Sequence, residues 1–154
     1  MMMKLAEALL LRADIQKKIA SLRERIVANA VVQDGNKPHE NPADLMKQAV
    51  GALGDLEDLV TKINRTNLKT KLKDGRTLTD AIARRDTLVS QHALYVAAIA
   101  GSKKEPERYS PREIKWVATL EVAKLQKQVD DLAKKLRELN GEIQKANWEA
   151  NLSA

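Results

Sequence analysis

The clearest fold signal in the chain lies in residues 122–146, which read VAKLQKQVDDLAKKLRELNGEIQKA. Aliphatic side chains recur there at alternating intervals of three and four residues: Val122, Leu125, Val129, Leu132, Leu136, Leu139, Ile143 and Ala146. Because an α-helix makes one turn in about 3.6 residues, this spacing places them in one stripe on one face of a helix. Charged side chains occupy the other faces, as in helices that pair in coiled coils. We therefore expect a helix over residues 120–149 that packs against another helix.

Three earlier segments repeat this spacing, and we expect helices over residues 4–30, 42–65 and 78–100. Their stripes are Leu5, Ala8, Arg12, Ile15, Ile19, Leu22 and Ile26, then Leu45, Ala49, Ala52, Leu56, Leu59 and Ile63, and finally Leu78, Ile82, Arg85, Val89, His92, Val96 and Ile99. Asn41 and Pro42 suit a helix start, since asparagine caps free amides and proline needs no amide partner there. Gly51 and Gly54 disfavour the second helix, so we expect another helix to approach closely at these glycines.

Two short segments change to a period of two, which is typical of β-strands. In residues 67–78, Leu68, Thr70 and Leu72 alternate with lysines, and Asp74-Gly75 then gives a hairpin turn signal. Residues 113–119 alternate in the same way around Trp116. We expect a small β-ribbon, and its strands can pair either within one chain or between two subunits.

The expected fold is mainly α: an elongated four-helix coiled-coil-like bundle with a small β-ribbon, in a single domain of residues 1–154. The chain has no Phe and only 3% aromatic residues, so its core must be built from Leu, Ile, Val and Ala. It has no Cys, which excludes disulfides, thiolate metal sites and thiol catalysis. Its two His residues, His39 and His92, lie far apart in the sequence. We therefore expect no metal site, no cofactor and no enzymatic activity.

Positive charge is concentrated in residues 64–85, where seven Lys and Arg stand against two Asp and Glu, a net +5. The candidate binding residues are Asn64, Arg65, Asn67, Lys69, Lys71, Lys73, Arg76, Arg84, Lys115 and Trp116. A dense group of cations attracts phosphate groups, which favours a nucleic-acid-binding surface. Capping of helix ends and turns by the same side chains is the structural alternative.

Polar residues interrupt two of the apolar stripes, at Arg12, Arg85 and His92. Polar groups in a helix seam can fix its register or the number of subunits, provided that they find partners such as Asp14 or Asp86. Trp148 lies near the end of the last expected helix. Large aromatic side chains commonly anchor interfaces, so we expect Trp148 in a contact between subunits.

Several strings of residues resemble the septicolysin-like family of small bacterial proteins. They include Ile63-Asn64-Arg65-Thr66-Asn67, Asp74-Gly75-Arg76-Thr77-Leu78-Thr79 and Ile114-Lys115-Trp116-Val117. The resemblance covers nearly the whole chain. What it implies, through the family name, is a membrane-active, pore-forming toxin.

The patterns favour a non-enzymatic, homo-oligomeric helical-bundle protein that acts in the cytoplasm as an interaction or scaffold protein. The first alternative is a nucleic-acid-binding module that uses residues 65–85. The second is the membrane-active toxin that the resemblance implies. We expect no membrane span, because no apolar run in the sequence approaches the ~20 residues that a spanning helix needs.

Overall fold

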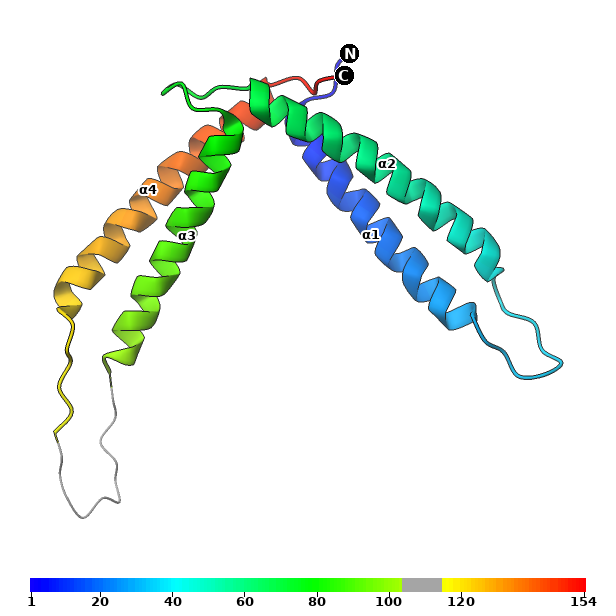
Figure 1. Ribbon diagram of the computed structural model, residues 1–154, viewed down its shortest axis with the longest axis horizontal. Helices are drawn as coiled ribbons and strands as arrows, with labels where there is room; N and C mark the ends of the chain where they lie inside the picture. Colours follow the sequence, from blue (N-terminus) through cyan, green and yellow to red (C-terminus); the bar gives the residue numbers. More distant parts are fainter. Residues whose placement is uncertain (104–114) are drawn as a thin grey trace. The chain divides into compact units, whose positions relative to one another are not determined.

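The computed structural model describes residues 1–103 and 115–154, and these residues are mainly helical (Figure 1). Four helices follow in chain order: α1 Leu5–Asn29, α2 Pro42–Lys69, α3 Leu78–Gly101 and α4 Val122–Glu149. The predicted mainly α class with four helices is confirmed. By their internal contacts the residues form two compact units, Met1–Leu78 with Gln144–Ala154, and Thr79–Ile143. The single domain predicted over residues 1–154 stays a prediction beside this division.

The first unit is built on an antiparallel pair of helices, α1 and α2 (Figure 1). Its core includes Leu22, Leu45 and Ala49, with Ile26 packed against them. Asn41 caps α2 as expected, because its side-chain oxygen accepts a hydrogen bond from the Ala43 amide at 2.9 Å. The apolar stripes predicted for both helices face inward: their members are buried or half-buried.

The two ends of the chain pair with each other and then join α2. The Leu5 amide donates to the Ala150 carbonyl at 2.9 Å, and the Leu152 amide donates to the Met3 carbonyl at 2.8 Å. The Ser153 amide donates to the hydroxyl of Thr66, which is itself buried near the end of α2, at 2.9 Å. The terminal segments are therefore a structural part of the first unit.

The second unit consists of α3 and most of α4. In α4 the predicted stripe is correct, since Val129, Leu132, Leu139 and Ile143 are buried. In α3 the predicted stripe is wrong along part of its length: Val89 is 51% exposed and Val96 is 45% exposed, whereas Leu88 is only 3% exposed. The inward line is Ala81, Arg85, Leu88, His92, Tyr95 and Ile99, all buried or half-buried. This line also has three- and four-residue spacing, so period alone did not distinguish the two.

The predicted β-ribbon is wrong. Residues 67–69 belong to the last turn of α2, so only Thr70, Lys71 and Leu72 precede the turn. A single antiparallel bridge joins Lys71 to Thr77, and the described residues contain no strand. The Asp74-Gly75 turn itself is present, with Gly75 at a φ of 86°. Residues 115–118 are not in a strand, and residues 113–114 of the second expected segment lie outside the described residues.

The close helix approach expected at Gly51 and Gly54 is also absent. A Cβ atom added at either glycine would have nothing within 4 Å. Both residues are exposed on α2. Packing among residues 1–103 and 115–154 therefore does not explain these glycines.

Candidate protein-binding surfaces

The predicted basic residues of the first unit gather at one end of α2. Asn64, Arg65, Asn67 and Lys69 lie on its last turns, and Lys71, Lys73 and Arg76 lie on the loop that follows. All are exposed except Asn67, which is half-buried. The lysines that alternate with Leu68, Thr70 and Leu72 were expected to lie on one strand, where period two would give Lys69, Lys71 and Lys73 a common face; this is wrong, because Lys69 is helical.

Some of these cations hold the local structure together. Arg76 Nε donates to Asp74 Oδ2 at 2.7 Å, and the Arg76 amide donates to Asp74 Oδ1 at 3.0 Å. These hydrogen bonds lower the pKa of the Asp74 carboxyl. Arg65 Nη1 donates to the Ala154 carbonyl oxygen at 3.4 Å. The structural alternative therefore accounts for Arg65 and Arg76, and leaves the three lysines exposed to solvent.

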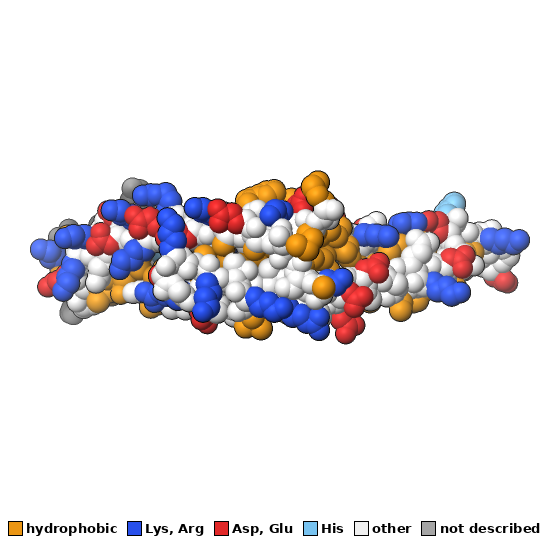
Figure 2. All heavy atoms as spheres, turned by 90° about the horizontal axis from the view of Figure 1, so that it is seen from above, with side chains coloured by type: hydrophobic (Ala, Val, Ile, Leu, Met, Phe, Trp, Pro, Cys, Tyr) orange, Lys and Arg blue, Asp and Glu red, His pale blue; other side chains and the backbone are white. Residues whose placement is uncertain are grey.

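The remaining candidates lie elsewhere. Arg84, Lys115 and Trp116 are exposed residues of the second unit, and Trp116 is 57% exposed. The structure thus does not gather all ten predicted binding residues into one unit. Figure 2 shows one face of the molecule, on which blue and red side chains are intermixed.

The three polar residues of the stripes are half-buried on their helices, as is usual next to a helix contact. Arg85 donates through Nε and Nη2 to the Oδ1 atom of Asp86, at 3.1 and 3.0 Å. Arg12 and His92 make no ion pair with another described residue. Trp148 is 56% exposed on α4. The register role of Arg12, Arg85 and His92 and the interface role of Trp148 stay predictions.

A surface that the sequence reading missed runs along α2. Met46, Val50 and Leu53 are 51%, 62% and 51% exposed, and Val60 is half-buried on the same line. We call these four residues the outer stripe. Their spacing of four, three and seven residues keeps them on one face, about 100° around the helix from the buried stripe of Leu45, Ala49 and Ile63. The sequence contains this second line of apolar residues beside the first, interrupted at Glu57.

The helix α1 extends this apolar surface. Leu9 and Ala13 are half-buried, and Ala20 and Val27 are exposed. They too lie about 100° from the buried stripe of their helix, in the same rotational sense as the outer stripe of α2. In an antiparallel helix pair, equal offsets in the same sense point to the same side. This side of the first unit, which we call the apolar side, therefore carries apolar residues of both helices, with the exposed Glu57 and Gln16 between them.

The other side of the same helix pair carries a groove of about 760 Å³. Its apolar lining comes from Met2, Met3, Leu11, Ile15, Leu59 and Leu152. Asp55, Asp58 and Lys62 add charge to it from α2. None of these three side chains forms an ion pair with another described residue.

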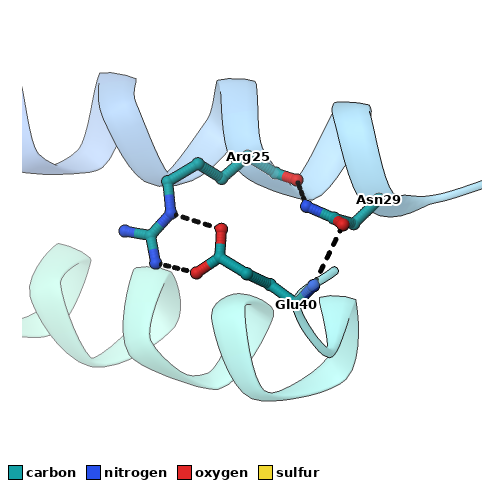
Figure 3. A network of polar contacts seen from close by, with 3 residues as sticks. All are labelled: Arg25, Asn29 and Glu40. Carbon is teal, nitrogen blue, oxygen red and sulfur yellow. Dashed lines mark hydrogen bonds and ion pairs between the residues drawn. The ribbon is translucent and has the colours of Figure 1, made fainter. Parts of the chain in front are cut away.

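Near the end of α1, a polar network joins α1 to Glu40 in the loop that leads into α2 (Figure 3). Both guanidinium nitrogens Nε and Nη2 of Arg25 donate to the Glu40 carboxylate, and the Glu40 amide donates to Asn29 Oδ1 at 3.1 Å. The Arg25 hydrogen bond lowers the pKa of Glu40 and raises the pKa of Arg25. This network orients the hairpin, and both its charges are used within it.

Within residues 1–103 and 115–154, no group of three or more His, Asp or Glu side chains could hold a metal ion. In the same residues, no helix is both long and apolar enough to cross a membrane. What the described residues do offer are an apolar side and a groove on one helix pair. Both are features through which proteins bind other molecules.

The chain belongs to a family of unknown function (DUF6847), whose pattern matches residues 12–152. It is also similar to the crystal structure of a functionally unknown conserved protein from Corynebacterium diphtheriae. The two sequences are 37% identical, the TM-score is 0.92, and the likeness covers 99% of this chain and 100% of that one. No curated protein matches the chain.

These findings correct the family expected from the sequence. The resemblance to the septicolysin-like family is wrong, because the family that matches is a different one and the similar structure carries no toxin description. The strings that suggested it, such as Asn64-Arg65-Thr66-Asn67, lie at a helix end that they help to close: Thr66 accepts from Ser153, and Arg65 donates to Ala154. The toxin alternative rested on the family name and has no other support.

Proposed function

We propose that this protein is a non-enzymatic interaction protein that forms a homodimer through the apolar side of the α1 and α2 pair. The observation that carries the proposal is the exposed outer stripe on α2. Met46, Val50 and Leu53 each leave about half of their surface in water. If a partner covers the exposed half of such a side chain, the assembly gains about 1 kcal/mol of stability.

The size of the surface suits a dimer. At about 1.5 Å per residue, helices of 25 and 28 residues are about 40 Å long. Two helices side by side are about 20 Å wide. Their common side therefore offers about 800 Å², which is the area that each partner contributes to an interface of standard size. The apolar residues of both helices supply the nonpolar part of that area, and exposed polar residues such as Glu57 supply the rest.

The arrangement of the outer stripe favours a second copy as the partner. Met46 and Val60 lie seven residues before and after Leu53. Two α2 helices crossing antiparallel at Leu53 would put Met46 of each against Val60 of the other, which is the self-complementary pattern of a two-fold interface.

The test is the mass of the protein in solution, measured by light scattering after size-exclusion chromatography. Wild type is expected at twice 17.2 kDa, and Leu53→Glu at 17.2 kDa. Gln48→Glu adds the same charge at an exposed position on another face of α2, and it should leave the dimer intact. Equal masses for wild type and Leu53→Glu would refute this interface. Circular dichroism of both variants checks that the helices are kept.

A second candidate function is binding of nucleic acid, supported by the exposed Lys69, Lys71 and Lys73 at one end of the first unit. Phosphate contacts by three lysines predict affinity that falls steeply as salt rises. Replacing all three by Gln should then abolish retention of the protein on immobilised DNA. Retention that survives this change would discard the candidate. The cytoplasm stays the expected compartment for either function.

A further inference from the structure

The groove on the first unit, on the side away from the outer stripe, is a second place where a partner can bind. Lys62 follows Leu53 by nine residues, which at about 100° per residue places them on opposite sides of α2. The groove therefore stays open when two copies pair through the outer stripe. Its use by a partner is independent of the proposed dimer.

The groove has an apolar floor of unusual composition. Leu59 forms its most buried part at 7% exposure, and Ile15 is half-buried beside it. Met2, Met3 and Leu11 stand around the floor and keep 69%, 39% and 39% of their surface in water. Methionine side chains are flexible and polarisable, so grooves lined with them adapt to apolar side chains of different shapes.

Acidic side chains flank this apolar floor. Asp55 and Asp58 are three residues apart on α2, so they lie on one face and one turn from each other. Both carboxylates are exposed and unpaired among the described residues, although Lys62 is within one further turn. The three charges sum to −1 at the groove, in a chain whose net charge is +6. The local charge at the groove is therefore opposite in sign to the net charge of the chain.

From these features we infer that the groove binds a basic amphipathic helix of another protein. Such a helix would lay its apolar face on Met3, Leu11 and Leu59, and would turn lysines or arginines toward Asp55 and Asp58. The groove is open to solvent and is lined along α2 by residues three and four positions apart, which suits a helix whose apolar residues recur at the same intervals. The stretch from Asp55 to Lys62 is about 10 Å long, or two turns of a bound helix.

The experiment uses the full chain and two fluorescent synthetic peptides of about 18 residues, one of Leu and Lys in amphipathic helical order and one with Glu in place of Lys. Fluorescence anisotropy measures binding of each. The Lys peptide should bind and the Glu peptide should not. Asp55→Asn with Asp58→Asn should weaken binding of the Lys peptide by about tenfold, and Lys62→Gln should tighten it by about threefold. Both effects should shrink at high salt.

A matched control separates the groove from general electrostatics. Asp131→Asn with Glu138→Gln makes the same change in net charge at exposed positions on α4, outside the groove, and should leave peptide binding unchanged. Leu53→Glu should also leave it unchanged, even where that variant abolishes the dimer. The inference is overturned if neither peptide binds, if both bind equally, or if the control weakens binding as much as the groove variant does. It is overturned as well if the groove variant changes only the mass of the protein, since the groove would then hold a second copy.

Discussion

The hydroxyl of Thr66 should hold the end of the chain against α2, and its loss should be measurable. Thr66 is 2% exposed, and its Oγ1 donates to the Lys62 carbonyl at 2.8 Å while accepting from the Ser153 amide at 2.9 Å. Thr66→Val keeps the shape of the side chain and removes both hydrogen bonds. The Ser153 amide then loses its acceptor, so we expect a loss of about 2 kcal/mol of unfolding free energy.

Chemical denaturation gives the change in stability, and hydrogen exchange of the Ser153 amide gives its location. Thr66→Ser is the control, because it keeps the hydroxyl and removes one methyl group at a cost of about 1 kcal/mol. Exchange at Ser153 should speed up in Thr66→Val and stay slow in Thr66→Ser. If the two variants lose equal stability and exchange Ser153 at the same rate, the hydroxyl does not secure the chain end.

Three further predictions concern other parts of the molecule. Leu88→Ala should destabilise the protein by about 2–5 kcal/mol and Val89→Ala by no more than about 0.5 kcal/mol in thermal or chemical unfolding; the reverse order would restore the stripe expected from the sequence. Gly51→Ala should add about 1 kcal/mol of stability, because the site is open and alanine favours a helix; a loss would mean that something unseen packs there. The folded-state pKa of Glu40 lies below its ordinary value of 4.5, so the stability that its pair with Arg25 contributes is complete above that value and is lost as pH falls through the lowered pKa. Melting temperatures recorded from about pH 6 to about pH 3 should therefore fall more in wild type than in Glu40→Gln, and parallel curves would count against the pair.

Much of the fold followed from one property of the sequence. The three-and-four spacing of aliphatic residues located all four helices, and the Asn41-Pro42 pair marked the start of α2 correctly, because capping depends only on neighbouring residues. The inward-facing side of α3 could not be predicted from the sequence, because Leu88 and Val89 each continue a stripe with three- and four-residue spacing. Only the packing of the second unit decides between them. The prediction of a β-ribbon was wrong because the alternation in residues 67–72 is only a weak signal for a strand. The tendency of α2 to continue by one more turn is stronger.

The candidate sites were harder to predict than the helices. Charge density in residues 64–85 drew attention to cations, yet Arg65 and Arg76 turned out to stabilise the chain end and a turn. The outer stripe could have been found, because Met46, Val50, Leu53 and Val60 lie on one helix face, although Glu57 interrupts their three-and-four spacing. The groove could not, since its lining comes from both ends of the chain and two helices. Their meeting depends on tertiary structure.

Sedimentation equilibrium of the wild-type chain over a hundredfold range of concentration tests the central proposal most directly. If two copies meet through the side of the helix pair that carries Leu53, the average mass will rise with concentration from 17.2 kDa toward twice that value and level off there. A mass that stays at 17.2 kDa throughout, or that climbs past the dimer without a plateau, would contradict a closed two-fold pair.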